Sequence, residues 1–338
     1  MSAGETLDRY RSLILDGLRE ALAGETQLRG ILRYHVGMAD AEGNPANAFG
    51  KLLRPSLVLM TAEGLGAEAR NALGAAVALE LVHNFSLIHD DIQDRDDVRR
   101  GRPTVWSLHG IAEAINAGDL MLTIAMAVGI ESGAPIAGAL ARAVDRMVEG
   151  QSLDLQFESR VVATDQYLEM VDRKTGALLS CALELGGLCA HAGPAVVALL
   201  IGLGRSIGRA FQIQDDLLGV WGDGDVVGKP QGSDIRRRKK SFPIAMAFAR
   251  SSGQDRERLQ AIFAAPAADG ARNEEDVCDA DVSWVIELLD RLDVRLEGEK
   301  AVSAYHAEAL VAIEALPFVS EIAEEMRALV ERLAGRVR

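Results

Sequence analysis

This 338-residue sequence has few of the features that mark secreted, membrane or nucleic-acid-binding proteins. Its three cysteines are an odd number without metal-ligand spacing, so they predict neither a disulfide framework nor a zinc site. Lysine and arginine total 36 against 50 acidic residues, and the net charge of −14 argues against bulk binding of nucleic acid or anionic membranes. Aromatic residues make up only 4%. These shortages favour an acidic, soluble globular protein.

Long uncharged runs are also scarce. The longest, residues 185–204, is interrupted by His191, Gly193 and Pro194. It therefore predicts two buried helices that meet at a turn and not a membrane span. The opening stretch MSAGETLDRY is polar and carries acids, unlike a secretory or transit segment. We expect no membrane span and a cytoplasmic location.

What the sequence does contain is apolar residues at helical spacing, for example Leu288, Leu292 and Leu296. Sustained alternation of period two is absent, so the fold class predicted is all-α. Two segments depart from the helical pattern: residues 221–241 are predicted as a long loop and residues 265–281 as a solvated linker. No internal repeat is found, and we expect a single domain over residues 1–338.

The stretch SLIHDDIQDRDD places five aspartates within eight residues at the end of an apolar helical segment. A helix C-terminus is already negative, so this placement is unfavourable unless a cation lies nearby. Helical geometry puts Asp90, Asp91 and Asp94 on one arc, at about 0°, 100° and 40°. A solvated acidic face is the alternative interpretation. His89, beside Asp90, is expected to pack or to form a hydrogen bond.

A second apolar run, RAFQIQDDLLGVWGD, again ends in paired carboxylates, Asp215 and Asp216. If the two acidic helix ends face one another, they form a metal-binding mouth. Carboxylates without histidine or cysteine ligands are typical of Mg²⁺ sites and not of zinc sites.

Small basic groups lie along the chain in the stretches FGKLLRP, VRRGRPT, RKTG and GKPQGSDIRRRKK. Arginine forks match phosphate oxygens, and lysine acts as a mobile point charge. Each group alone is typical of a solvated surface. Together with two acidic helix ends, they predict two separate diphosphate sites.

These motifs resemble those of the trans-isoprenyl diphosphate synthases, the polyprenyl synthetase family, over about residues 49–243. LIHDDIQD with RRGRPT is similar to the first aspartate-rich motif, and FQIQDDLLG with GKPQGSD is similar to the second. The resemblance implies a single large helical bundle around a deep central apolar cavity. It also implies a homodimer, with three Mg²⁺ ions per active site, that joins an allylic diphosphate to isopentenyl diphosphate.

The resemblance further implies roles for individual residues. The Mg²⁺ ligands would be Asp90, Asp91, Asp94, Asp215 and Asp216. The allylic diphosphate would be bound by Arg99, Lys174, Lys229 and Lys239. Isopentenyl diphosphate would be bound by Lys51, Arg54, His83 and Arg100. Polar positions around the reacting carbons are matched by Thr175, Gln151 and Gln212.

The sequence departs from the family pattern at two positions. Leu52 stands where the family usually has arginine, and Gly219 stands where the second motif usually has its third aspartate. Asp223 lies eight residues beyond Asp215, and the sequence leaves open whether it replaces the missing ligand.

The reaction that joins these parts is ionisation of the allylic diphosphate followed by attack of the isopentenyl double bond, which gives a product five carbons longer. A class I terpene cyclase binds only one diphosphate and has no use for Lys51, Arg54 and His83. A squalene-type head-to-head synthase takes two allylic substrates. A non-catalytic partner subunit of a heteromeric synthase is the remaining alternative, and Gly219 is the residue that hints at it.

Product length in such an enzyme depends on how far the growing apolar tail can run. The family resemblance assigns the block to Phe85, five positions before Asp90, and the motif DDIQD has no insertion. This favours geranylgeranyl diphosphate as product, with farnesyl diphosphate next. On a helical wheel, however, Ser86 and Val82 lie closer to Asp90, at about −40° and −80° against −140° for Phe85. Phe85 is alternatively an ordinary core residue.

Overall fold

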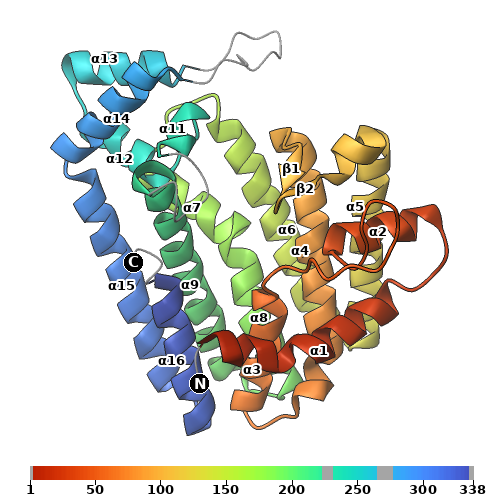
Figure 1. Ribbon diagram of the computed structural model, residues 1–338. Coiled ribbons are helices and arrows are strands. Elements are labelled where there is room, and N and C mark those ends of the chain that lie inside the picture. The colour runs from red at the N-terminus through yellow and green to blue at the C-terminus, as the bar shows by residue number, and fades with distance from the viewer. Residues whose placement is uncertain (1–2, 223–230, 265–276, 335–338) are drawn as a thin grey trace. The chain divides into compact units, whose positions relative to one another are not determined.

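The computed structural model describes residues 3–222, 231–264 and 277–334, and the predicted all-α fold is confirmed over them (Figure 1). The only strands in these ranges are β1 (Val98–Arg99) and β2 (Arg102–Pro103), which form an antiparallel hairpin. The predicted turn is found, because α8 (Gly176–Cys189) ends and α9 (Pro194–Trp221) begins on either side of it. Helix α8 is largely buried, whereas the first turns of α9 are largely exposed, so the prediction of two buried helices is wrong for the start of α9.

Two of the predicted non-helical segments are shorter than expected. Helix α9 continues to Trp221, and the short helix α11 (Ser233–Arg236) lies within the predicted loop. The predicted linker cannot extend to residue 281, since α14 (Asp279–Arg291) begins at Asp279. The rest of both segments, residues 223–230 and 265–276, lies outside the described residues.

The chain divides into two compact units, each built from separate stretches of sequence. Unit 1 comprises the described parts of residues 1–144, 178–201 and 314–328. Unit 2 comprises the described parts of residues 145–177, 202–313 and 329–338. The single domain and the deep central cavity expected from the family resemblance stay predictions.

Unit 1 contains α1 (Ala3–Ala21), α2 (Gln27–Val36), α3 (Leu53–Gly64), the 3₁₀ turn η1 (Ala69–Ala72), α4 (Leu73–Asp94) and α5 (Val105–Glu131). It also contains the first part of α6 (Ala134–Phe157), most of α8, the start of α9 and most of α16 (Ser320–Ala334). The remainder of α6 and α9 belongs to unit 2 with α7 (Thr164–Lys174), α11, α12 (Phe242–Arg250), α13 (Gly253–Ile262), α14 and nearly all of α15 (Val294–Ala315).

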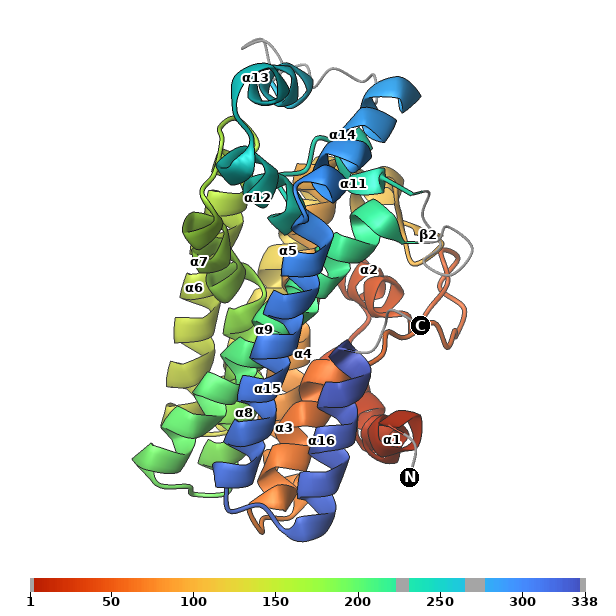
Figure 2. The same cartoon turned by 90° about the vertical axis from the view of Figure 1, so that its left-hand side faces the viewer.

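Helix α4 is the central helix of unit 1. Its residues 75–82 are all buried, which is expected of a helix that is apolar around its whole circumference. It lies beside α5 and α3, as Figures 1 and 2 show. Because the apolar part of α4 is fixed by packing, its acidic C-terminal turns are held in a defined place.

The N-terminal helices of unit 1 are fixed by local sequence signals. Thr26 caps α2 by accepting a hydrogen bond from the Arg29 N–H at 3.3 Å. Gly37 ends the helix in the left-handed region (φ 92°), and a Cβ there would lie 2.4 Å from the backbone of Ala48. Only glycine permits both the conformation and the close approach.

Helix α1 pairs with both α3 and α16 through charged side chains. Arg9 lies 3.0 Å from Glu63 and 3.2 Å from Glu325, and the Tyr10 hydroxyl donates to Glu63. The backbone N–H of Val319 also donates to the Gly64 carbonyl at 2.8 Å. Segments more than 300 residues apart in the chain therefore join at one helix.

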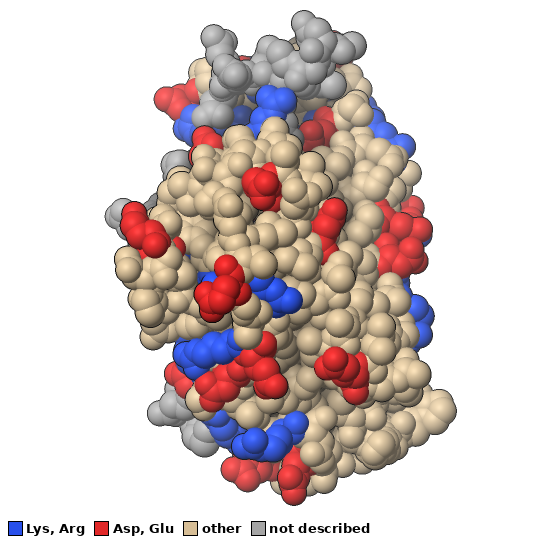
Figure 3. All heavy atoms as spheres, turned by 90° about the vertical axis from the view of Figure 1, so that its right-hand side faces the viewer, with Lys and Arg blue, Asp and Glu red and all other residues tan. Residues whose placement is uncertain are grey.

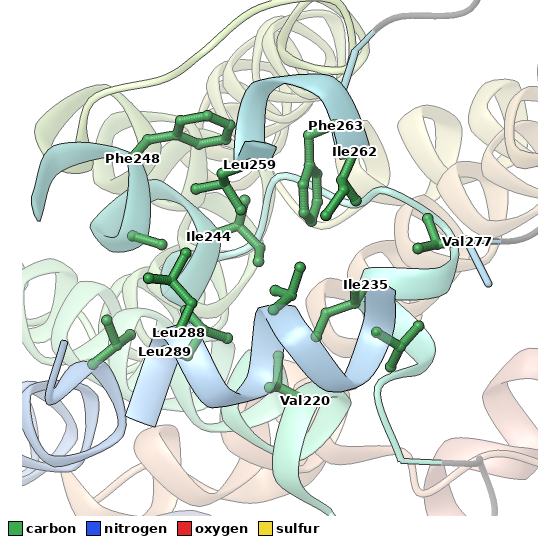
Figure 4. Packing of buried hydrophobic residues seen from close by; sticks show 14 residues of the cluster. Val220, Ile235, Ile244, Phe248, Leu259, Ile262, Phe263, Val277, Leu288 and Leu289 are labelled. Atoms are coloured by element: carbon green, nitrogen blue, oxygen red, sulfur yellow. The ribbon is translucent and has the colours of Figure 1, made fainter. Parts of the chain in front are cut away.

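Unit 2 has two apolar clusters. One lies among α12, α13 and α14, where Phe248, Leu259 and Leu288 pack together with Val220 and Ile235 (Figure 4). The other joins α7, α9 and α12 and includes Tyr167 and Phe242. Ile235 of the first cluster and Phe242 of the second lie on either side of Lys239, so both ends of this segment are fixed by packing.

Three helical stretches among the described residues are long and apolar enough to cross a membrane by length and composition: residues 69–94, 105–131 and 194–221. In the first stretch 67% of the most apolar 18-residue window is buried inside the structure, against 33% and 39% in the other two. The burial of the first follows from its central place in unit 1. The expected absence of a membrane span stays a prediction.

Candidate active site

The first group of predicted ligands lies on the last turns of α4. Asp90 and Asp94 are half-buried, whereas Asp91 is only 1% exposed. The helix ends where Arg95 adopts a left-handed conformation (φ 56°). The last turn carries no basic residue, so the carboxylates add to the negative end of the helix dipole. This arrangement favours a bound cation.

Asp91 is the most constrained of these carboxylates. Arg99 Nε donates to its Oδ1, while its Oδ2 is buried and has no hydrogen-bond partner. Burial raises the pKa of Asp91 to about 6, although the charge of Arg99 opposes this effect. A buried carboxylate oxygen without a donor fits a metal ligand.

Among the described residues, no three histidine, cysteine, aspartate or glutamate side chains converge into a preformed metal site.

A small pocket lies beside Asp91, between hairpin β1–β2 and α2. Its basic residues are Arg99, Arg100 and Arg102. The guanidinium of Arg102 stacks on Tyr34, with its central carbon 4.2 Å from the ring centre, and the Tyr34 hydroxyl donates to the hairpin backbone at 2.7 Å. These contacts fix the hairpin against α2 and concentrate positive charge in the pocket.

Residues predicted to bind isopentenyl diphosphate come together in the same unit. Arg54 Nη1 lies 3.2 Å from His83 Nε2, and the Arg100 guanidinium packs so closely on Gly50 that a Cβ there would lie 2.6 Å from it. Lys51 follows on the surface. Burial lowers the pKa of Arg54, although the charge of Glu80 opposes this effect, and burial lowers the pKa of His83 well below its usual value. The charge of Arg100 lowers both pKa values further. A bound anion would relieve this crowding of positive charge.

Two residues of this unit whose polar side chains reach the interior were missed by sequence reasoning. His35 lines the basic pocket, and its Nε2 is buried without a partner. Burial, followed by the charges of three arginines, lowers the pKa of His35 to about 3, so its ring is neutral. Glu80 is 6% exposed, accepts a hydrogen bond from Asn84 at 3.1 Å and has its pKa raised by burial. The signal for Glu80 was a single charge in an otherwise apolar stretch.

The other group of predicted residues lies in unit 2, where α7, α9 and the segment before α12 meet. Thr175 Oγ1 donates to Gln212 Oε1 at 2.9 Å, and Gln212 Nε2 donates to Asp216 Oδ1 at 3.1 Å. Lys239 Nζ donates to the same oxygen at 3.1 Å. Four residues that the sequence singled out separately thus form one hydrogen-bonded chain.

Lys239 is surrounded by carboxylates. Its Nζ also lies 3.5 Å from Asp234 Oδ2, and Asp215 and Asp154 are near enough to act on it electrostatically. Burial alone would lower the pKa of Lys239, but the carboxylates outweigh it and raise the pKa. The side chain therefore stays positively charged.

Lys174 and Gln151 are brought to one place by close helix packing. A Cβ at Gly150 of α6 would lie 2.3 Å from the backbone nitrogen of Lys174, so only glycine allows this approach to the end of α7. Gln151 follows directly on α6, and Lys174 Nζ donates to Asp154 one turn further on. Lys229 lies outside the described residues.

The paired aspartates of α9 have different environments. Asp215 is exposed, whereas Asp216 is 0% exposed. Asp216 Oδ2 accepts from the backbone N–H of Phe242 at 2.9 Å and from the hydroxyl of Tyr167, another residue that the sequence did not reveal. This environment argues against the predicted metal-ligand role of Asp216. The approach of the two acidic helix ends stays a prediction.

Comparison with known proteins adds to this geometry. The family model described as polyprenyl synthetase matches residues 42–279. The chain belongs to the polyprenyl synthetase family. The curated (2E,6E)-farnesyl diphosphate synthase of Mycobacterium tuberculosis is 45% identical over 238 residues, which cover 69% of this chain and 66% of that enzyme. A short chain isoprenyl diphosphate synthase of Methanothermobacter thermautotrophicus is 39% identical, with 86% of each chain covered.

Solved structures of the family have the same fold. The polyprenyl synthetase of Streptomyces coelicolor A3(2) superimposes with a TM-score of 0.88 at 35% identity, covering 97% of this chain and 98% of that one. The geranylgeranyl pyrophosphate synthase of Corynebacterium glutamicum, solved in complex with isoprenyl diphosphate and magnesium, has a TM-score of 0.78 at 27% identity, covering 98% and 99%.

Both departures from the polyprenyl synthetase pattern have a structural setting. Leu52 is 5% exposed and adopts a left-handed conformation (φ 52°) at the start of α3, so an apolar side chain is buried there. A Cβ at Gly219 would lie 2.5 Å from the carboxylate of Asp234. Asp234 thus occupies the space of the absent side chain. Asp223 lies outside the described residues.

This contact predicts opposite outcomes for two glycines of α9. Gly219→Ala should destabilise the protein by about 1–3 kcal/mol, because Asp234 must move away from Lys239. Gly202→Ala, with nothing within 4 Å of its added Cβ, should instead stabilise it by about 0.5–1 kcal/mol. Urea denaturation of both variants checks this, and a stabilised Gly219→Ala would refute the contact.

The residues assigned to chain length lie on α4 near His89. Phe85 is 6% exposed and its ring centre is 5.0 Å from that of His89, in an edge-to-face arrangement. His89 packs on Gly118 of α5 and its Nε2 lies 3.4 Å from the Ile115 carbonyl oxygen. Val82 is fully buried, and Ser86 Oγ donates to the backbone.

Proposed function

We propose that this chain is a trans-prenyltransferase that condenses an allylic diphosphate with isopentenyl diphosphate head-to-tail. The product is a short-chain all-trans prenyl diphosphate, with geranylgeranyl diphosphate favoured over farnesyl diphosphate, and pyrophosphate is released. The observation that carries the proposal is the grouping of Arg54, His83 and Arg100 in unit 1. Arg54 and Arg100 supply positive charge to this group, whereas the polar chain around Lys239 belongs to unit 2.

Two anion-binding sites suit a reaction of two diphosphates. Isopentenyl diphosphate binds at Lys51, Arg54, His83 and Arg100, and the allylic diphosphate binds at Arg99, Lys174, Lys229 and Lys239. Positive charge at the second site stabilises the negative charge that develops on the departing diphosphate. Thr175, Gln151 and Gln212 lie around the reacting carbons. The allylic cation is attacked by the isopentenyl double bond, and the released pyrophosphate takes the final proton.

The residues that would hold Mg²⁺ are Asp90, Asp91, Asp94 and Asp215, and bound Mg²⁺ would neutralise diphosphate charge. The buried unpaired oxygen of Asp91 and the exposed carboxylate of Asp215 support this assignment. Three ions per active site remain part of the proposal.

The alternatives are less well supported. A class I terpene cyclase would not need the cationic group around Arg54. A non-catalytic partner subunit would be expected to lose metal ligands, whereas Asp90, Asp91 and Asp94 are all present. Gly219 lacks the carboxylate that the family usually has at this position, but the carboxylate of Asp234 lies beside Gly219.

Turnover by the purified chain tests the proposal directly. The enzyme is incubated with isopentenyl diphosphate, Mg²⁺ and dimethylallyl, geranyl or farnesyl diphosphate, and the product alcohols are identified by mass. We expect elongation to the C20 product. Cyclised hydrocarbons formed without isopentenyl diphosphate would favour a cyclase, and no turnover without a second subunit would favour the partner-subunit alternative.

Removal of Lys51 or Arg54 should separate the two diphosphate sites. Lys51→Ala or Arg54→Ala should cost about 1.5–3 kcal/mol of charge-assisted binding, seen chiefly as a raised KM for isopentenyl diphosphate. The KM for the allylic substrate should change less. Exposed Arg70, on η1, provides a charge-matched control whose alanine variant should leave both KM values unchanged. If only the allylic KM rises, the two sites have been assigned in reverse.

Exposed apolar side chains of α5 support the proposed homodimer. Leu108, Ile111, Ile115 and Ile130 are 41–65% exposed, and uncharged side chains form a broad area on the face of the molecule shown in Figure 3. Burying these side chains against a second copy removes apolar surface from water. Analytical ultracentrifugation of the Ile111→Glu variant should detect monomers if this part of α5 forms the interface.

The cytoplasmic location also remains a proposal.

A further inference from the structure

Asp216 accepts hydrogen bonds from four donors in the interior of unit 2. Tyr167 and the backbone N–H of Phe242 donate to Oδ2, and Gln212 and Lys239 donate to Oδ1. A carboxylate offers about four lone-pair sites, so Asp216 is saturated. A metal ion could bind only by displacing one of these four donors, at the cost of the hydrogen bond that the donor makes.

The four donors come from segments that are distant in the sequence. Tyr167 lies on α7, Gln212 on α9, and Lys239 and Phe242 lie just before and at the start of α12. A single buried anion therefore fixes three segments relative to one another within unit 2. Two of its donors, Gln212 and Lys239, are residues proposed to act on the allylic substrate.

Tyr167 is suited to anchor this anion. The residue is 1% exposed and lies in the apolar cluster that includes Leu217 and Phe242. Burial, and then the charge of Asp216, raise the pKa of Tyr167 well above its usual value, so the phenol keeps its proton and donates. In such dry surroundings water cannot replace the donor, and the hydrogen bond holds Asp216 in one position.

Among the donors to Asp216, Lys239 has a side chain that is partly exposed to solvent. Its side chain is 40% exposed, although its ammonium lies 3.1 Å from Asp216 and 3.5 Å from Asp234. Its long flexible stem would otherwise sample many rotamers, at a cost in entropy when an anion binds. Contact with Asp216 reduces that cost in advance.

Building on the proposed function, we propose that Asp216 is a positioning residue that holds Lys239 and Gln212 for the allylic diphosphate, with Tyr167 as its anchor. Of the α9 pair, Asp215 alone then serves as a metal-binding carboxylate. Asp215 and Asp216 therefore have different functions. The sequence does not reveal this difference, because the two residues are identical and adjacent.

The test compares Asp215→Asn with Asp216→Asn in the full-length enzyme. Two quantities are measured: the allylic KM at saturating Mg²⁺, and the affinity for Mg²⁺ by calorimetric titration of enzyme saturated with inorganic pyrophosphate. Asp216→Asn should raise the allylic KM at least about tenfold, the loss expected for one charged hydrogen bond, and leave the Mg²⁺ affinity within about twofold. Asp215→Asn should weaken Mg²⁺ binding by about tenfold or more without a change in melting temperature.

Tyr167→Phe keeps the test decisive if Asp216→Asn does not fold, because it removes only one of the four donors. It should raise the allylic KM by about threefold to tenfold with unchanged Mg²⁺ affinity. Tyr305→Phe is the matched control, since its hydroxyl faces Arg209 in the same unit and not Asp216. That variant should change neither quantity.

Weakened Mg²⁺ binding in Asp216→Asn or Tyr167→Phe, equal to that in Asp215→Asn and with the allylic KM unchanged, would overturn the positioning role. So would an unchanged allylic KM in Tyr167→Phe. Failure of the proposed function would be recognised separately, because the unmodified enzyme would then form no elongated product.

Discussion

Replacing Asp90 or Asp91 with alanine is expected to lower turnover at least ~10²-fold, because each change removes a carboxylate that would stabilise the transition state through Mg²⁺. The fold should survive in Asp90→Ala, since a half-buried negative charge is removed from the negative end of α4. Steady-state rates at saturating substrates, together with thermal melting, check both statements.

Asp97 provides the control for this change. It belongs to the same acidic cluster, its side chain is exposed, and the family resemblance assigns it no role. Asp97→Ala should retain near-normal turnover. Near-normal turnover in Asp90→Ala, with melting unchanged, would eliminate the metal assignment for the first motif.

Phe85→Ala is the second change with a large expected effect. If the ring blocks the growing tail, its removal opens the path and shifts the products beyond geranylgeranyl diphosphate. If Phe85 is an ordinary core residue, the variant loses ~3–5 kcal/mol of stability and product length is unchanged. Mass analysis of the product alcohols and urea denaturation of the same preparation separate the two outcomes.

A buried phenylalanine of unit 2 calibrates the stability loss. Phe248 is 2% exposed in the apolar cluster of α12, α13 and α14. Phe248→Ala should cost a similar amount of stability while the product distribution stays as in the unmodified enzyme. Longer products in Phe248→Ala would mean that loosening the fold alone changes chain length, and the assignment of Phe85 would then fail.

Much of the fold could be predicted because its signals are local. Apolar spacing of 3.6 residues identifies helices wherever they are packed, and His191, Gly193 and Pro194 marked the turn between α8 and α9. The start of α14 at Asp279 was missed since its first turn is acidic and resembles solvated linker. Asp279 and Asp281 are, however, favourable at a helix N-terminus.

The sequence also predicted which residue types form the candidate active site, but it did not predict which of them are buried or what they contact. A helical wheel gives the angles of Asp215 and Asp216 and does not say which side of α9 is covered by other helices. The burial of Asp216 depends on Tyr167 and Phe242, which are distant in the sequence and carry no motif of their own. The same holds for Gly219, whose meaning depends on a carboxylate fifteen residues later.

The attachment of α1 and α16 to α3 has a consequence for biosynthesis. Unit 1 carries the first acidic motif, yet its described parts extend to residue 328, where Glu325 pairs with Arg9. During translation, α3 and α4 leave the ribosome long before the segment that completes their packing. Until most of the chain has been synthesised, the nascent part of unit 1 keeps apolar surface exposed. Such a state favours chaperone binding.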